Sequence, residues 1–273
     1  YKRQNIYRGC THGCIYCDSR SNCYGFTHEF EDIEVKANAP QLLEKALKSK
    51  RKKCMIGTGA MCDPYLQAEE KLKLTRRCLE LIDKYEYGVA IQTKSTRILR
   101  DMDILKSINA KAKAVVQMTM TTYDETLCKI LEPNVSTTHE RFEALMQFKK
   151  AGIPTVVWLT PILPFINDTK ENINGILDYC MEAGVKGIIC FNMGVTLRDE
   201  TGNIFIRHWT DIFQGLRKNT SIHMEMHMIW QALITRNLWI CSEKDAPKME
   251  LSMIQMSVSG IFMSYRINMF RCF

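Results

Sequence analysis

Four cysteines lie within fourteen residues near the start of the chain, in the stretch "CTHGCIYCDSRSNC". Cys10, Cys14 and Cys17 have the spacing C-x3-C-x2-C, and Cys23 follows six residues later. On a short loop, this spacing lets three thiolates converge on one metal centre. Three protein ligands leave one coordination position open, which suits an iron–sulfur cluster that binds a substrate or cofactor.

A structural zinc site is the alternative interpretation of the same loop. The two-residue gap between Cys14 and Cys17 also suits zinc, which would take a fourth ligand from Cys23, His12 or His28. The protein would then be a zinc-stabilised nucleic-acid-binding module without catalysis. The 273-residue chain is much larger than such a module needs, so we place this interpretation second.

The chain has twelve cysteines, but their pattern does not indicate a secreted disulfide scaffold. Disulfide-rich scaffolds are short exported chains, and this chain is long and shows no export signal. Five further cysteines lie inside apolar or helical patterns, where we expect them to be buried as small hydrophobic residues. They are Cys54, Cys78, Cys128, Cys180 and Cys190.

Apolar strand-like runs alternate with amphipathic helical patterns through about residue 192, after a first short strand in "RQNIY". Such alternation predicts parallel strands with helices outside, as an open sheet or a barrel. The expected strands are 54–59, 88–93, 113–121, 154–163 and 185–192, and the expected helices are 39–50, 69–85, 96–109, 135–152 and 170–184.

Polar clusters follow the expected strands at their carboxyl ends, which is where barrel folds carry their chemistry. These clusters are the cysteine loop, "GAMCDPY", "TKS", "TTYDE" and "TPILPFINDT". We therefore expect them to meet at one edge of the sheet.

The stretches "YRGCTHGCIYCDSRS" and "GTGAMCDPY" resemble the radical S-adenosylmethionine (SAM) superfamily. They are most similar to the bacterial group related to spore photoproduct lyase, often described as DNA-repair-photolyase-like. The resemblance covers residues 5–199 and implies an α/β fold, a partial (β/α)6 TIM-like barrel of the radical SAM type.

The resemblance also implies a cofactor set and a reaction. Cys10, Cys14 and Cys17 would hold a 4Fe–4S cluster, whose fourth iron would bind SAM. One electron, from a donor such as flavodoxin or ferredoxin, would cleave SAM to a 5′-deoxyadenosyl radical that abstracts hydrogen from a substrate. The implied activity is lyase-like, on an unknown substrate for which nucleic acid is the candidate.

Further positions follow by matching the motifs of the family. Tyr16 would lie against the adenine of SAM. Lys94 in "QTKS" and Thr121, eleven residues before Glu132, would serve the SAM carboxylate. Asp63 matches a Ser-Asp-Pro step after the second strand and is a further candidate for cofactor binding.

The chain departs from the lyase pattern at two places. In the lyase a cysteine two positions before the matched serine donates a hydrogen atom, and Ala60 stands there in this chain. Cys62 occupies the serine position and is a candidate hydrogen donor. Asp18 follows the third cluster cysteine, where the lyase has tyrosine. Repair of thymine dimers is therefore not the activity we expect.

The net charge and the hydropathy of the chain limit which partners and which cellular location we expect. The formal net charge of +7 is compatible with a nucleic-acid or acidic partner without requiring one. No apolar run is long enough to span a membrane. The first ten residues lack the apolar core of a signal peptide, so we expect a cytoplasmic protein. The cysteines follow the first residue so closely that we also expect a missing upstream segment.

The composition changes from about residue 204. Eight of the 16 Met and three of the four Trp, but only two of the 14 Gly, lie in 204–273. Restoring one G in the codon for Glu200 gives a continuation of ordinary globular composition that is similar to the family. We therefore expect a radical SAM partial barrel over 1–203 and a frameshifted, poorly packed tail over 204–273.

Overall fold

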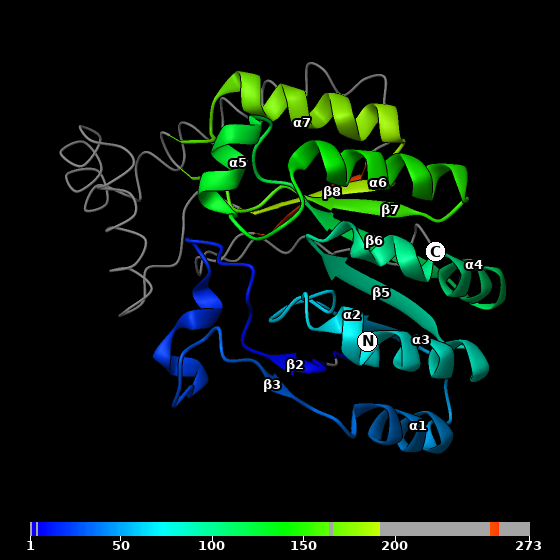
Figure 1. Cartoon of the computed structure of the whole chain (residues 1–273). Helices are drawn as coiled ribbons and strands as arrows, with labels where there is room; N and C mark the ends of the chain where they lie inside the picture. Colours follow the sequence, from blue (N-terminus) through cyan, green and yellow to red (C-terminus); the bar gives the residue numbers. More distant parts are fainter. Residues whose placement is uncertain (1, 4, 164–165, 192–251, 257–273) are drawn as a thin grey trace.

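A computed structural model describes residues 2–3, 5–163, 166–191 and 252–256 of the chain (Figure 1). Its main sheet is parallel throughout, with the strand order β1-β4-β5-β6-β7-β8-β9. The strands are β1 (Lys2–Arg3), β4 (Met55–Thr58), β5 (Gly88–Thr93), β6 (Ala114–Thr119), β7 (Thr155–Trp158), β8 (Gly187–Phe191) and β9 (Ser252–Met256).

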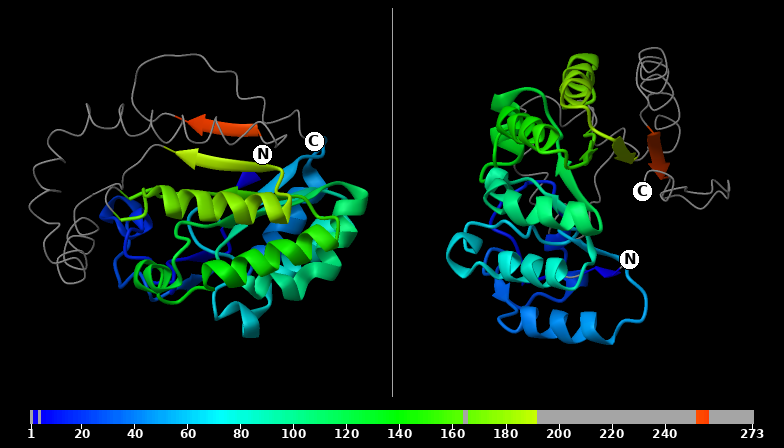
Figure 2. Two further views of the ribbon diagram at one scale, coloured as in Figure 1. Left: turned by 90° about the horizontal axis from the view of Figure 1, so that it is seen from above. Right: turned by 90° about the vertical axis from the view of Figure 1, so that its right-hand side faces the viewer.

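Helices connect the successive strands of the main sheet from β1 to β8 and lie along one side of the sheet, as the right-hand view of Figure 2 shows. They are α1 (Ala39–Ser49), α2 (Glu69–Leu72), α3 (Leu74–Lys84), the 3-10 helix η3 (Thr96–Asp101), α4 (Met102–Lys111), α5 (Glu125–Leu131), α6 (Thr138–Lys150) and α7 (Lys170–Ala183). Parallel strands joined by helices outside the sheet confirm the predicted α/β fold and its partial-barrel arrangement.

The cysteine loop connects the two strands of a second, smaller sheet. In this sheet β2 (Tyr7–Arg8) pairs antiparallel with β3 (Glu34–Val35), and the intervening segment contains the 3-10 helices η1 (Asp18–Arg20) and η2 (Asn22–Tyr24). Figure 1 shows this dark blue segment at the end of the molecule toward which β5 points, below α5. The loop therefore lies at the carboxyl edge of the main sheet.

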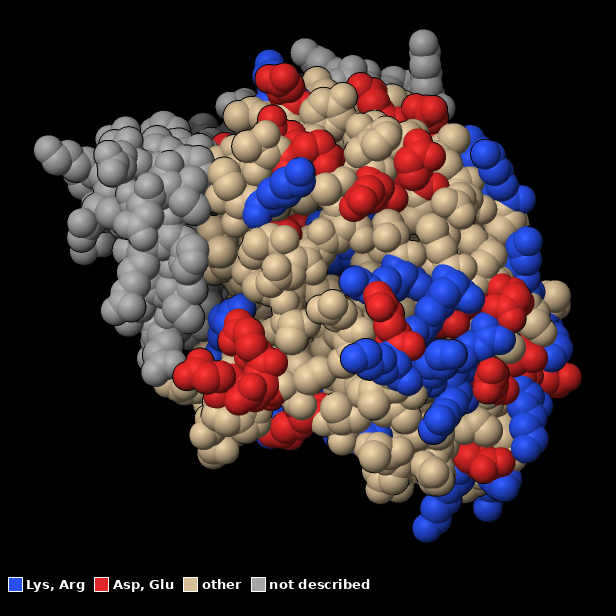
Figure 3. Space-filling model, viewed as in Figure 1, with Lys and Arg blue, Asp and Glu red and all other residues tan. Residues whose placement is uncertain are grey.

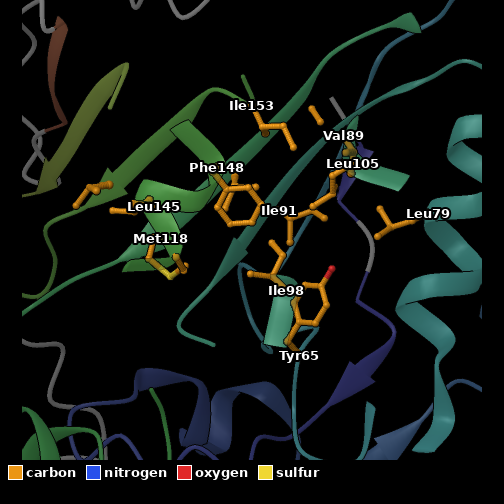
Figure 4. Close-up of a cluster of buried hydrophobic side chains, with 14 of the residues drawn as sticks. Tyr65, Leu79, Val89, Ile91, Ile98, Leu105, Met118, Leu145, Phe148 and Ile153 are labelled. Carbon is orange, nitrogen blue, oxygen red and sulfur yellow. The ribbon is translucent and has the colours of Figure 1, made fainter. Parts of the chain in front are cut away.

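The core lies between the main sheet and its helices (Figure 4). Alternate residues of the central strands, such as Val89 and Ile91 of β5 and Met118 of β6, are fully buried. They pack in one cluster with helix residues such as Leu105 and Phe148. In β5 and β6 the residues between these are mostly buried too, which is typical of parallel sheets, and this packing fixes the strand ends that carry the polar clusters.

Two helices differ from their predicted form. The expected helix 69–85 is broken at Lys73, whose φ of +50° is left-handed. The break lets the side chain of Glu69 accept hydrogen bonds from the amides of Leu74 and Thr75 at the start of α3. Helix α5 was not predicted, although Asp124 caps it by accepting from the amide of Leu127.

Five residues of the segment 204–273 form β9, which pairs parallel with β8. The rest of that segment lies outside the described residues, and so does Glu200, where we expect the frameshift. The division into 1–203 and 204–273 therefore stays a prediction. Among the described residues, no helix has both the length and the apolar character needed to cross a membrane.

Candidate active site

The cysteine loop is held in place by backbone hydrogen bonds to residues far along the chain. The amide of Ile15 donates to the carbonyl of Leu131 at 3.1 Å, and the amide of Asn134 donates to the carbonyl of His12 at 3.1 Å. The side-chain amide of Asn134 donates to the carbonyl of Thr11 at 3.1 Å. The segment 131–134, at the end of α5, thus carries the loop.

Two glycines allow the loop to pack this closely. Gly9 has a φ of +85°, and a Cβ there would lie 2.5 Å from the carbonyl oxygen of Phe30. Gly13 has a φ of +71°, and a Cβ there would lie 3.1 Å from side-chain atoms of Pro133 and Asn134. A side chain at either position would strain the backbone and push the loop away from its support.

The three clustered cysteines are free thiols in different surroundings. Cys14 is buried, whereas Cys10 and Cys17 are half-buried. A hydrogen bond from Cys62, together with contacts to His12, outweighs burial and lowers the pKa of Cys10 to about 5. Burial raises the pKa of Cys14 and of Cys17. Of the three, Cys10 therefore has the surroundings that most favour the thiolate, the form that binds metal.

The donor set of three free thiols on one loop fits an iron–sulfur cluster. In a cubane cluster each thiolate binds a different iron, so the three sulfurs need not reach one ion. Within the described residues, no group of three or more His, Cys, Asp or Glu side chains is arranged to hold a single metal ion. His12 lies 3.6 Å from the Asp63 carboxylate and His28 lies 3.0 Å from Glu34, so two of the three candidate fourth ligands of a zinc ion contact carboxylates.

Lys94 directly follows β5 and enters a buried polar network beside the cysteine loop. Its Nζ donates to Glu132 Oε1 at 2.8 Å and to the Tyr16 hydroxyl at 2.5 Å. The Tyr16 hydroxyl in turn donates to Glu132. Burial, followed by the Glu132 charge, raises the pKa of Tyr16 well above its usual value, so the hydroxyl stays a donor.

Glu132 is also paired with Arg141, at 2.5 Å between Oε2 and Nη2, and both side chains are fully buried. Burial opposes ionisation of Glu132, but the charges of Arg141 and Lys94 outweigh it and hold the pKa of the carboxyl well below its usual range. Arg141 also donates to the carbonyls of Thr119 and Ser136, at 2.8 and 2.7 Å. The network is therefore fixed to the end of β6.

Asp63, in the segment after β4, forms hydrogen bonds with the end of β5. Its carboxylate accepts from the amide of Lys94 at 2.8 Å, from the Thr93 hydroxyl at 2.8 Å and from the amide of Tyr65 at 2.8 Å. The two strands also approach closely at Gly59, where a Cβ would overlap the carbonyl of Gln92. In this geometry Asp63 positions Lys94, and its predicted contact with a cofactor stays a prediction.

Thr121 follows β6 at the same edge of the sheet. Its side chain is fully buried, and its hydroxyl has no hydrogen-bond partner among the described residues. Two asparagines, Asn167 and Asn172, donate to its carbonyl at 2.8 and 3.1 Å and fix its backbone. A buried hydroxyl without a partner is rare in native proteins, so this orphaned group fits a site that receives a polar ligand.

Cys62 lies against the cysteine loop. Its Sγ donates to the carbonyl of Gly9 at 2.7 Å, the side chain neighbours Cys10, and the residue is buried. The structure thus brings together the predicted residues Cys10, Tyr16 and Lys94, with Cys62 at their side. Their roles toward a cofactor stay predictions.

Sequence reasoning missed the importance of Glu132 and Arg141. The sequence motifs mark Glu132 only as the residue eleven positions beyond Thr121, and no motif includes Arg141. Nothing in their separation of nine residues signals a pair, because the contact depends on how α6 packs beside α5. A charged residue at a buried position of the expected helix 135–152 was the available clue.

Comparisons with known proteins identify the family and the fold of the chain. A family model described as "Radical SAM superfamily" matches residues 5–180, more than half of the chain. An uncharacterized protein of Methanocaldococcus jannaschii is 33% identical over 168 residues, which cover 61% of this chain and 62% of that protein. An uncharacterized protein of Mycobacterium tuberculosis (strain H37Rv) is 27% identical over 215 residues, which cover 74% and 61%. The chain thus spans about three fifths of the length of these relatives.

Solved structures of low sequence identity share the fold. Spore photoproduct lyase complexed with dinucleoside spore photoproduct superposes with a TM-score of 0.57 at 14% identity, covering 75% of this chain and 59% of the lyase. Streptococcus suis SuiB superposes with a TM-score of 0.54 at 12% identity, covering 94% and 48%. The cysteine motif, the parallel sheet and the family match lead to one conclusion: the chain belongs to the radical SAM superfamily.

Proposed function

We propose that the protein reductively cleaves SAM at a 4Fe–4S cluster held by Cys10, Cys14 and Cys17. When bound, this cofactor pair supplies one-electron chemistry: SAM yields methionine and a 5′-deoxyadenosyl radical that abstracts a hydrogen atom from the substrate. The protein contributes the thiolates, the orientation of SAM and the exclusion of water. The observation that carries the proposal is the anchored loop of three free thiols beside the buried Lys94 network.

The charge of that network supports a subsite for the carboxylate of SAM. Lys94 and Arg141 supply two positive charges and Glu132 one negative charge, so the trio carries a net positive charge. A buried excess of positive charge favours an incoming anion. The unpartnered hydroxyl of Thr121 is a further donor for that anion. We propose Tyr16 as the neighbour of the adenine and Cys62 as a hydrogen donor beside the cluster.

A polyanionic substrate such as nucleic acid is our proposal for the substrate class, with a lyase-type reaction. Lys and Arg side chains gather over α2 and α3 (Figure 3). Several of them are paired, such as Arg97 with Glu70, whereas Lys71, Lys73 and Arg77 are exposed. The two neighbours have been solved with different ligands, a dinucleoside for the lyase and a precursor peptide for SuiB, so the fold itself selects neither class.

The surface proposal is tested by salt dependence. DNA binding through these side chains should weaken steeply as salt rises, and charge reversal at Lys71, Lys73 and Arg77 should flatten that dependence. Binding that is insensitive to salt, or binding of a peptide instead, would contradict it. We further propose a flavodoxin- or ferredoxin-type electron donor and a cytoplasmic location.

Anaerobic reconstitution tests the cluster and the reaction. The protein, supplied with iron and sulfide, should turn brown and hold about four irons. With dithionite and SAM it should release 5′-deoxyadenosine. Replacing Cys10, Cys14 and Cys17 with Ala should abolish both results. Cys78→Ala, which removes a buried thiol between α3 and the sheet, should preserve them.

The zinc interpretation predicts the opposite result. A colourless protein that holds one zinc ion and forms no 5′-deoxyadenosine would favour the zinc-stabilised module and contradict the radical SAM activity.

A further inference from the structure

The carboxylate of Glu132 joins four separate parts of the chain. It lies at the end of α5 and contacts Tyr16 of the cysteine loop, Lys94 after β5 and Arg141 of α6. The side chains of Glu132 and Arg141 are fully buried, and that of Lys94 is 18% exposed. Water therefore screens these contacts only weakly.

The same short segment supports the cysteine loop. Leu131 accepts from Ile15, and Asn134 bonds the carbonyls of Thr11 and His12. Glu132 stands between these two anchors. A displacement of its carboxylate would therefore affect both the cysteine loop and Lys94.

Arg141 prevents such a displacement. It donates to two backbone carbonyls as well as to Glu132, so several of its five N–H groups are fixed. A guanidinium held in this way acts as a rigid support, because its planar donors leave little freedom.

The contacts of Lys94 leave room for one more acceptor. Its ammonium has three N–H groups. One reaches Glu132 and one reaches Tyr16. Among the described contacts, the third N–H group has no acceptor in the protein, and Lys94 keeps a partly exposed side chain.

We propose that Glu132, held by Arg141, is a positioning residue that fixes Lys94 and Tyr16 so that the third N–H group of Lys94 meets the carboxylate of SAM. This inference rests on the proposed function and assigns a role to two residues outside the cysteine motif. Glu132 acts through Lys94 and Tyr16 and does not itself touch the cofactor.

The test compares Glu132→Gln with Glu69→Gln. Glu69 is a matched control because it is also fully buried and also contacts a tyrosine and an arginine, Tyr7 and Arg100. We measure iron content, SAM affinity by anaerobic calorimetry, the change that SAM causes in the electron paramagnetic resonance (EPR) spectrum of the reduced cluster, and the melting temperature.

Glu132→Gln should keep its iron but lose SAM affinity by roughly 10- to 100-fold, by analogy with the loss of a residue that orients a metal ligand. The change that SAM causes in the EPR spectrum should shrink in parallel. Glu69→Gln should lower the melting temperature and leave SAM affinity unchanged. Tyr16→Phe removes a single hydroxyl and should weaken SAM binding less than Glu132→Gln, which keeps the test usable if Glu132→Gln does not fold.

The outcomes separate this inference from the proposed function. Unchanged SAM affinity in Glu132→Gln, or in Tyr16→Phe where the former is unfolded, would overturn the inference alone. An equal loss of affinity in Glu69→Gln would also overturn it, because the effect would then follow from lower stability. A wild-type protein that holds the cluster but does not bind SAM would overturn the proposed function and the inference with it.

Discussion

Two regions of the molecule contain the same buried set of side chains, a glutamate with a tyrosine and an arginine. Glu69 accepts a hydrogen bond from the Tyr7 hydroxyl and forms an ion pair with Arg100. In the same way, Glu132 accepts from the Tyr16 hydroxyl and forms an ion pair with Arg141. Both carboxylates are about 1% exposed or less.

The two networks differ in their last partner. Glu69 accepts from the amides of Leu74 and Thr75, both at 3.1 Å, so it completes its contacts within the backbone of α3. Glu132 accepts instead from Lys94, a side chain at the carboxyl edge of the sheet. The Glu69 network is therefore structural, because its carboxylate accepts from backbone amides. The Glu132 network can also serve function, because its carboxylate accepts from Lys94, whose ammonium keeps one N–H group for a ligand.

The largest difference between the networks should come from their arginines. Arg141→Ala leaves Glu132 fully buried without its main partner and should cost about 3 kcal/mol or more of unfolding free energy. Arg100 is 27% exposed, and Glu69 keeps two amides, so Arg100→Ala should cost about 1–2 kcal/mol. Urea unfolding measures the free energy of unfolding of both variants. Equal losses in Arg141→Ala and Arg100→Ala would contradict the difference between the two networks.

Acid should destabilise the Glu132 network in a predictable direction. The folded protein holds the pKa of Glu132 below its usual value of 4.5. Its contribution to stability is therefore complete above that value and is lost as pH falls toward the folded pKa. Below about pH 4, wild type should lose up to about 1.4 kcal/mol per pH unit more than Glu132→Gln. Parallel pH profiles of the two proteins would contradict this.

The tyrosines should separate stability from cofactor binding. Tyr7→Phe removes a buried hydroxyl from Glu69 and should cost about 1 kcal/mol, with no change in SAM affinity. Thermal unfolding and calorimetry measure the two quantities. A weaker affinity for SAM in Tyr7→Phe would show that the first network also reaches the cofactor.

The smallest effect should come from the unpartnered hydroxyl. Thr121→Val removes a buried group without a hydrogen bond and should leave stability unchanged or raise it by up to about 1 kcal/mol. Thr138→Val is the control, since the buried hydroxyl of Thr138 donates to the carbonyl of Thr122 at 2.6 Å, and its loss should be destabilising. If Thr121→Val destabilises as much as the control, the hydroxyl is not an orphan.

The comparison also indicates what the sequence can predict. The alternation of strands and helices predicted the α/β fold, and the strand 88–93 has the predicted bounds. The cysteine spacing predicted a metal-binding loop; the structure places this loop at the carboxyl edge of the sheet, and its role toward a metal stays a prediction. These features are local, because they depend on residues near one another in the chain.

Features that depend on distant contacts were not predicted. The periodicity of the expected helix 69–85 continues through Lys73, but the contacts of Glu69 with two amides favour a break there. Likewise, the ion pair of Glu132 with Arg141 forms only because α6 packs beside α5, a contact between elements that the sequence pattern does not show. The competing tertiary contacts leave no periodic signal in the chain.

The most direct test of the account is electron–nuclear double resonance on the reduced, reconstituted protein with SAM labelled with 15N at its amino group. If Cys10, Cys14 and Cys17 leave one iron open for SAM, the cluster signal should show hyperfine coupling to the 15N nucleus. A cluster signal without such coupling, in a protein that holds about four irons, would contradict the central claim.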